Sequence, residues 1–198
     1  MESATPTKPR LHPTERRRLI EREALRLFGR DGYAATRLDD IASAAGVTKP
    51  VVYRHYASKK DLYLALLSRH EADLPTFVEG IELSANANLT EVIHPILEVW
   101  FDYIEENSDA WLIIFRDKTG DPEIERARRR VNDRATEVLA GLIRAVNPGL
   151  EPELAGPTAD FLRGGLATLV LWWIDHPDVL RESVMRVATR ACVATLRG

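Results

Sequence analysis

The chain has 198 residues, of which 45% are hydrophobic and 29% charged, and its formal net charge at pH 7 is −3. These values are typical of a soluble globular protein of one or two domains. The single cysteine, Cys192, excludes an internal disulfide and a metal site built from cysteines. The first ten residues lack the apolar stretch of a signal peptide. The longest apolar run, residues 165–174, is shorter than the roughly 20 residues of a membrane-spanning helix, so we expect a cytoplasmic protein.

Positive charge is concentrated at the N-terminal end of the chain. Residues 1–62 contain 13 Lys and Arg against 8 Asp and Glu, a net charge of +5, whereas the remaining residues carry −8. A basic segment joined to an acidic one indicates that the N-terminal part faces nucleic acid. Basic residues also solvate ordinary surface helices, so the asymmetry supports this interpretation only together with a binding motif.

The chain begins with a segment rich in proline, hydroxyl and basic residues. We interpret residues 1–12 as a flexible basic arm, from which Lys8 and Arg10 could reach DNA. The sequence Pro-Thr-Glu at 13–15 then predicts a helix start. This helix should end at residues 29–32, and its apolar stripe consists of Ile20, Ala24, Leu27 and Phe28.

The stretch from Thr36 to Leu62 predicts two short helices separated by a tight turn. Thr36 can cap the first helix, and apolar side chains follow at three- and four-residue steps, at Leu38, Ile41, Ala42 and Ala45. Gly46 provides the left-handed residue that ends a helix at the lowest cost. Thr48 can cap the second helix, and Pro50 lies in its first turn, where a missing N–H costs nothing. This arrangement predicts a helix-turn-helix motif at about 37–56, which reads DNA with its second helix.

Several short motifs in this region, taken together, resemble the TetR family of transcriptional regulators. The matching elements are Gly32-Tyr33 with Thr36, Ile41-Ala42, Ala45-Gly46-Val47, Tyr53-Arg54-His55-Tyr56, and Ser58-Lys59 with Leu62. The resemblance implies an all-α fold with an N-terminal three-helix helix-turn-helix DNA-binding head and a C-terminal helical ligand-binding and dimerisation bundle. We expect the head at residues 13–62, a bridging helix at 63–74 and the bundle at 75–198.

The resemblance also implies which residues meet double-stranded DNA. Tyr53 and Lys59 are expected to bind phosphates, as are Thr36 and His55, and such contacts fix the register on the duplex. The residues placed to meet base edges or the thymine methyl group are Arg37, Thr48, Lys49, Pro50 and Val51, and Arg54 lies on the same helix. Arg37 stands where the family often has a small hydroxyl residue and Pro50 where it often has glycine, so the base preference cannot be carried over.

The rest of the chain is predicted to be helical throughout. The period after Leu62 continues to about Asp73, and Pro75 then stops or bends the helix. Further helices are expected at 89–106, kinked or restarted near Pro95, and at 111–116, 121–146, 153–175 and 177–196. No segment has the alternation of a strand, and no internal repeat occurs.

The middle helices carry more aromatic bulk than a small helical bundle requires. In the family this region encloses a small-molecule site, and aromatic walls with a few polar groups are typical of one. The candidate ligand-binding residues are Phe77, His94, Trp100, Phe101, Tyr103, Trp111, Phe115 and Arg116, and Asp102 is a further polar candidate. Aromatic residues at helical spacing are also typical of a filled core, and the polar residues are also consistent with the surface.

The last two helices are apolar on more than one face, which indicates more than one packing partner. The resemblance implies a homodimer in which these helices from two subunits form a four-helix bundle. The expected interface residues are Leu162, Gly165, Leu166, Leu169, Trp173, Leu180, Val184, Val187 and Ala191. A two-fold dimer places its reading helices roughly 34–36 Å apart, which suits a palindromic operator. The alternative is that these residues form the core of a monomer.

The sequence contains no catalytic constellation, and we expect neither enzymatic activity nor a cofactor. Glu91, His94 and Glu98 have the acid-x-x-His spacing of di-iron bundles, but such bundles need two copies of the motif. The function we expect is that of a dimeric repressor released from its operator by a small, mainly apolar or aromatic effector. The alternatives are an activator, a DNA-binding regulator without an effector, and a helical-bundle protein with a metal site that does not bind DNA.

Overall fold

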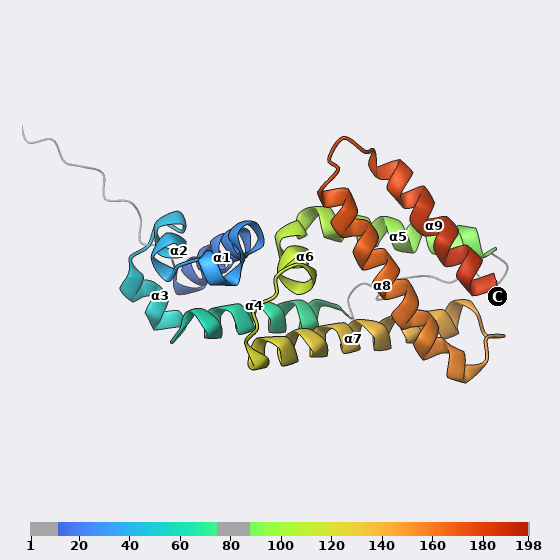
Figure 1. Cartoon of the computed structure of the whole chain (residues 1–198), viewed down its shortest axis with the longest axis horizontal. Helices are drawn as coiled ribbons and strands as arrows, with labels where there is room; N and C mark the ends of the chain where they lie inside the picture. Colours follow the sequence, from blue (N-terminus) through green and yellow to red (C-terminus); the bar gives the residue numbers. More distant parts are fainter. Residues whose placement is uncertain (1–11, 75–87, 198) are drawn as a thin grey trace, which may run out of the picture.

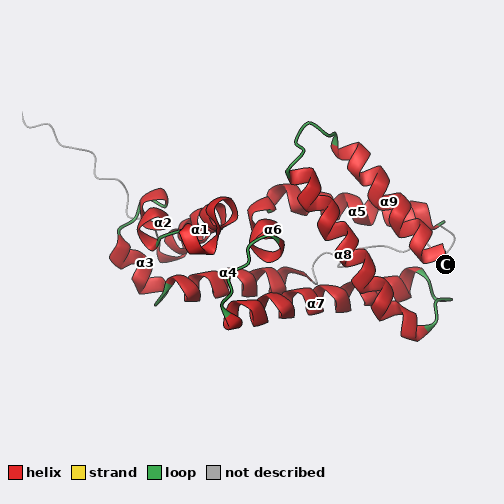
Figure 2. Ribbon diagram, in the orientation of Figure 1, coloured by secondary structure: helices red, strands yellow, loops and turns green. Residues whose placement is uncertain are grey.

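The computed structural model describes residues 12–74 and 88–197, which form an all-α fold (Figure 1). Neither of these ranges contains a strand, as Figure 2 shows. The predicted fold class is therefore confirmed. Within the same two ranges, no helix is long and apolar enough to cross a membrane.

Four helices form the N-terminal part of the molecule, namely α1 (Pro13–Ala35), α2 (Leu38–Ala44), α3 (Lys49–His55) and α4 (Lys59–Asp73). Helix α1 runs past the predicted end at residues 29–32, with a break at Gly32, where φ is 79°. The predicted burial of the α1 stripe is confirmed for Ile20, Ala24, Leu27 and Phe28, and that of the α2 stripe for Leu38, Ile41, Ala42 and Ala45.

The C-terminal part consists of α5 (Leu89–Glu106), α6 (Ser108–Phe115), α7 (Pro122–Val146), a 3-10 turn (Pro152–Leu154), α8 (Ala155–Ile174) and α9 (Arg181–Arg197). Helix α5 is continuous through Pro95, where the sequence predicted a kink or a restart. Helix α9 begins four residues later than predicted because a turn occupies residues 177–179. In Figure 1, α7 lies beside both α4 and α8, and α9 packs on α5 and α8.

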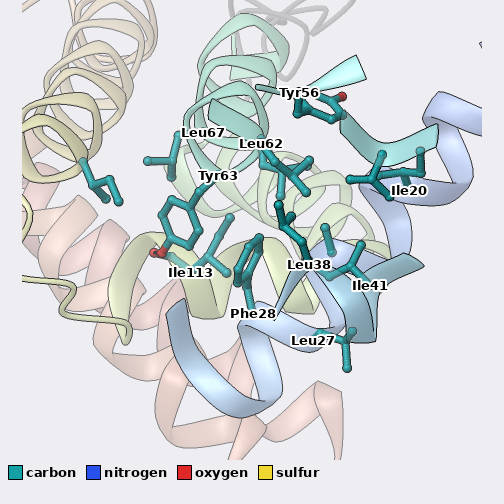
Figure 3. Close-up of a cluster of buried hydrophobic side chains, with 14 of the residues drawn as sticks. Ile20, Leu27, Phe28, Leu38, Ile41, Tyr56, Leu62, Tyr63, Leu67 and Ile113 are labelled. Atoms are coloured by element: carbon teal, nitrogen blue, oxygen red, sulfur yellow. Dashed lines mark hydrogen bonds between the residues drawn. The ribbon is translucent and has the colours of Figure 1, made fainter. Parts of the chain in front are cut away.

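One hydrophobic cluster joins the N-terminal part to the C-terminal part (Figure 3). It contains Phe28 of α1 and Tyr63 of α4, whose ring centroids lie 5.0 Å apart, and it continues to Ile113 of α6. Gly29 allows this approach, since a Cβ atom there would lie 3.2 Å from the carbonyl oxygen of Asp109 in α6. The two parts therefore share a core instead of being joined by a flexible linker.

Candidate DNA interface and ligand cavity

The turn between α2 and α3 determines how α3 leaves the protein. Gly46 has a φ of 65°, a conformation that glycine adopts readily and other residues do not. The Val47 N–H donates to the Ala42 carbonyl over 2.9 Å, which closes the turn. Val52 is fully buried in the core of the N-terminal helices, so the opposite face of α3 points toward solvent. The sequence predicted this geometry correctly.

Six of the predicted DNA contacts lie on this solvent face or at its edge, and all six are exposed: Arg37, Thr48, Lys49, Pro50, Tyr53 and Arg54. The Lys49 ammonium lies 2.9 Å from a carboxylate oxygen of Asp39, and the Arg37 guanidinium lies 3.9 Å from the other. Asp39 thus partly neutralises two exposed cations. Val51 and His55 are half-buried. Burial, and to a smaller extent the positive charge of Arg17, lowers the pKa of His55.

Thr36 has partners inside the protein instead of on its surface. Its side chain is buried, and its hydroxyl donates to the carbonyls of Leu27 over 3.2 Å and Gly32 over 2.8 Å. Thr36 is the C-cap residue of α1, and the N-cap of α2 is Arg37. The prediction that Thr36 caps the first motif helix was therefore wrong, because its hydroxyl turns back to the preceding helix.

Lys59 also makes its contacts within the protein. Its Nζ donates to the carbonyls of Tyr33 over 2.6 Å and Thr36 over 2.9 Å, and it lies 4.4 Å from the Tyr33 ring centroid. These carbonyls form the negative end of α1, where a cation is favourable. Burial lowers the pKa of Lys59. The structure thus gives this side chain a part in fixing α4 to α1, and the phosphate contact that the resemblance implied stays a prediction.

A buried acid, Glu21 of α1, fixes the end of α3 and the bridging helix α4 to one another. It accepts hydrogen bonds from the Tyr56 hydroxyl over 2.5 Å, from Arg17 over 2.8 Å and from Arg69 over 2.8 Å. Burial alone would raise the pKa of Glu21, but the hydrogen bonds from Tyr56 and Arg17 and the charges of Arg17 and Arg69 outweigh it and lower the pKa. Burial raises the pKa of Tyr56 to about 12, so its hydroxyl stays a donor. Together, Glu21 and its three partners are called the Glu21 network.

A cavity of about 150 Å³ lies among α4, α5, α6, α7 and α8. Four of the predicted ligand-binding residues line it, namely Trp100, Tyr103, Trp111 and Phe115. The Trp111 ring centroid lies 4.5 Å from that of Phe115 and 5.5 Å from that of Trp100. The aromatic residues therefore border an open space, and the interpretation as a wholly filled core does not apply to these four.

The other predicted ligand-binding residues do not line this cavity. Phe101 is fully buried in the core against Trp173, with ring centroids 5.4 Å apart. His94 is exposed, 3.7 Å from the Glu98 carboxylate, and Arg116 pairs with Asp175 over 2.7 Å on the surface. Asp102 is exposed and pairs with Arg181 over 2.6 Å, and Phe77 lies outside the described residues.

The sequence did not single out several polar residues of the cavity as ligand-binding residues. His70 of α4 is buried, and its Nδ1 lies 2.9 Å from the Tyr103 hydroxyl. Asn132 of α7 accepts from Arg163 of α8 over 3.1 Å, and both line the cavity. His70 carried one available signal, since it follows Leu62 and Leu66 at four-residue steps and is polar on an apolar stripe.

A second, smaller cavity of about 50 Å³ adjoins the first, and the described residues that line it are apolar apart from Cys192. The two cavities share the side chains of Leu97, Leu139 and Leu166, among others. The second cavity extends to α9, where it ends against Cys192 and Leu196. The two cavities are therefore neighbours with a common apolar wall between α4 and the C-terminal helix.

The predicted dimer residues divide between the inside and the outside of the subunit. Leu162 and Val184 are buried within the subunit, Leu166 lines both cavities, and Leu169 and Trp173 pack on a core cluster. The exposed members are Gly165, Leu180, Val187 and Ala191. Two exposed aromatic residues that the prediction omitted, Phe161 and Trp172, lie on the same face of α8 as Gly165, at four- and seven-residue steps.

The residues of the acid-x-x-His motif, Glu91, His94 and Glu98, make contacts with other parts of α5 or with one another. Glu91 completes the capping box of α5 by accepting from the Asn88 N–H over 3.0 Å. In the part of the chain that the structure describes, no group of three His, Cys, Asp or Glu side chains could hold a metal ion. Glu91 therefore acts at the start of a helix in this structure.

Comparisons with known proteins agree with the fold and the motif. The family model "Bacterial regulatory proteins, tetR family" matches residues 20–66. The HTH-type transcriptional activator FasR of Mycolicibacterium smegmatis is 34% identical over 170 residues, which cover 84% of this chain and 76% of that protein. A TetR-family regulator from Streptomyces coelicolor superimposes with a TM-score of 0.71 at 24% identity, covering 93% and 82% of the two chains. The regulator FadR from Bacillus subtilis in complex with stearoyl-CoA superimposes with a TM-score of 0.67 at 14% identity, covering 90% of this chain and 96% of that one. This chain belongs to the TetR family of DNA-binding transcriptional regulators.

Proposed function

We propose that this protein is a dimeric cytoplasmic regulator whose binding to a palindromic operator is controlled by a small, mainly apolar effector. In this proposal residues 13–62 are the DNA-binding head, residues 63–74 are the bridging helix, and residues 75–198 bind the effector and form the dimer. One observation carries the proposal. Helix α4 lines the cavity with His70, as does its C-cap residue Leu74, and the same helix joins the Glu21 network through Arg69.

The solvent face of α3 supports the assignment of the DNA contacts. Lys49, Tyr53 and Arg54 stand exposed on this short helix, and Arg37 adds a further cation at its edge. Lys49 and Arg37 both contact the Asp39 carboxylate in the free protein. On DNA, these two exposed cations would leave Asp39 and bind a phosphate or a base acceptor instead. Thr48, Pro50 and Val51 are placed to meet base edges, and His55 stays a candidate phosphate contact.

The exposed apolar surface of α8 and α9 supports the dimer. The exposed fractions are 69% for Phe161, 45% for Trp172, 71% for Leu180 and 54% for Val187. Large apolar side chains grouped in this way mark an interaction site. Gly165 and Ala191 are exposed on the same two helices and would let a second helix approach closely.

The cavity supports an effector with an apolar body. Its wall is mostly aliphatic and aromatic, and a cavity of about 150 Å³ is large enough to hold a benzene-sized group. FadR, which shares the fold, was crystallised with stearoyl-CoA, so an acyl chain is one candidate for the apolar part. We propose repression relieved by the effector, as the family resemblance favours. FasR is named an activator, and a regulator can activate from one operator position and repress from another.

Footprinting of the DNA upstream of the protein's own gene tests this proposal. The full chain should protect a palindromic sequence. Light scattering on the free protein should give the mass of a dimer. Protection should be lost when an apolar ligand that binds the cavity is added. A monomeric chain that protects no duplex at low ionic strength would overturn the proposal. Protection by a dimer that responds to no apolar ligand would favour a regulator without an effector.

A further inference from the structure

Two buried nitrogen atoms in the wall of the main cavity lack hydrogen-bond partners. His70 is 5% exposed, and its Nε2 has no partner among the described residues. The same is true of the indole Nε1 of Trp111. Both residues line the one cavity, from α4 and from α6. Buried polar groups in folded proteins nearly always have a partner, so two unpaired nitrogens on residues that line one cavity indicate that a ligand supplies the partner.

The chemistry of the two nitrogens identifies the kind of group that fits. The indole Nε1–H of Trp111 is a donor only. Burial lowers the pKa of His70 to about 4, so its imidazole is neutral at pH 7 and carries one proton. The Tyr103 hydroxyl lies 2.9 Å from Nδ1, and when it donates to this atom the imidazole proton is on Nε2. Two residues that line the cavity then carry an N–H donor each, and a carbonyl oxygen has two lone pairs with which to accept.

We propose that His70 Nε2–H and Trp111 Nε1–H bind a carbonyl oxygen of the effector, as in a fatty acyl ester or thioester. This proposal rests on the proposed function and specifies the effector for the same cavity. A neutral carbonyl fits better than a carboxylate, since the lining cation Arg163 is already paired with Asp160 over 2.6 Å. A buried carboxylate without a cation would be strongly unfavourable.

The remainder of the effector is apolar and extends away from α4. The wall beyond the two donors consists mainly of aliphatic side chains from α5 and α7, including Ile96, Leu97 and Leu139. Leu97 and Leu139 also line the second cavity, which has no polar side chain other than the thiol of Cys192. The carbonyl therefore lies beside α4, and the chain points toward α9.

Infrared spectroscopy and calorimetry on the full chain test this orientation with methyl octanoate labelled with ¹³C at its carbonyl. When the ester is bound, its carbonyl band should lie at lower frequency than in hexane, because hydrogen bonds weaken the C=O bond. His70→Asn keeps a polar atom near the position of Nδ1 for Tyr103 but ends short of Nε2. His70→Gln reaches the position of Nε2. His70→Asn and Trp111→Phe should each move the band toward its hexane position and weaken binding roughly 5-fold, and His70→Gln should restore both.

His94→Asn is the matched control, because His94 is an exposed histidine of α5 that does not line the cavity. It should leave the band and the affinity unchanged. A band at the hexane position in the unsubstituted protein would overturn the carbonyl assignment and leave the proposed function intact, and this measurement needs no variant. The carbonyl assignment would also be overturned, and the proposed function left intact, if all variants gave the same carbonyl band and the same affinity as the unsubstituted protein. Failure of the unsubstituted protein to bind the ester or any alkane would overturn the proposed effector site as well.

Discussion

Acidification should destabilise this protein through His70. Burial lowers the pKa of His70 in the folded chain to about 4, from an ordinary value of 6.5. Between these two values the unfolded chain binds a proton at this position and the folded chain does not. The free energy of unfolding therefore falls as the pH is lowered from 6.5 toward 4, and above 6.5 the histidine has no effect on it.

The size of this effect follows from the two pKa values. One pKa unit corresponds to about 1.4 kcal/mol, so His70 should cost about 2.5 kcal/mol of stability at pH 4.5 relative to pH 7.5. The assay is urea unfolding at both pH values, at a fixed protein concentration because the proposed dimer would make stability concentration-dependent. The Glu21 network contributes a separate loss, since the lowered pKa of Glu21 matters only below its ordinary value of 4.5.

Comparison with His70→Gln isolates the histidine from all other titrating groups. The variant keeps a polar side chain but does not titrate in this range, so its stability should fall less between pH 7.5 and pH 4.5, by about the 2.5 kcal/mol derived above. His94→Gln, at an exposed histidine, should behave like the unsubstituted protein. If the His70→Gln protein shows the same pH dependence as the unsubstituted protein, the imidazole is not held neutral by burial and the assigned hydrogen-bond donors are wrong.

Four further substitutions test the DNA-binding head and the proposed dimer. Gly46→Ala should lower the free energy of unfolding by about 1–2 kcal/mol in urea titrations, since only the positive φ opposes the methyl group and nothing lies within 4 Å of it. Lys59→Met should cost about 2 kcal/mol of stability and leave the salt dependence of DNA binding unchanged, because its ammonium bonds to carbonyls of α1. Lys49→Ala, by contrast, should leave stability unchanged and alter sequence preference in a binding-site selection, and the opposite pattern in these two lysines would contradict both assignments. Phe161→Glu should raise the dimer dissociation constant more than 100-fold in analytical ultracentrifugation, and an intact dimer would place the interface elsewhere.

The helix-turn-helix could be predicted because its determinants are local. The stripe from Leu38 to Ala45 and the left-handed Gly46 lie within ten residues of one another, so period and turn chemistry suffice. Lys59 shows where this reasoning ends. Its partners, Tyr33 and Thr36, are 26 and 23 residues earlier in the chain, and nothing in the local sequence shows that the ammonium turns toward them.

The same limit applies to the apolar helices α8 and α9. Leu162 and Phe161 are neighbours, and hydropathy does not distinguish them, yet one is buried inside the subunit and the other is 69% exposed. A helix that is apolar on two faces gives no indication of which face meets its own subunit. The place of His70 in the cavity was equally out of reach, since its contact with Tyr103 spans 33 residues and depends on how α4 packs against α5.

Helix α4 connects the cavity to the DNA-binding head through two consecutive residues. Arg69 pairs with Glu21 of α1 over 2.8 Å, and His70 lies 2.9 Å from the Tyr103 hydroxyl of α5. Any movement of α4 that an effector stabilises at His70 therefore acts on the Glu21 network, and through Tyr56 on the end of α3. The shared core around Phe28 and Tyr63 is close-packed, so the head should change position between two discrete arrangements and not by gradual bending.

Such a switch sets a lower limit on what the effector must supply. Moving the population from 1:99 to 99:1 requires roughly 10⁴-fold tighter binding to one arrangement than to the other. Two hydrogen bonds to the carbonyl, at roughly 5-fold each, provide about 25-fold. The remaining factor of about 400 corresponds to roughly 3.5 kcal/mol, or four to five methylene groups buried in only one arrangement. The oxygen at His70 and Trp111 would then select the effector, and the apolar chain between α5 and α7 would drive the switch.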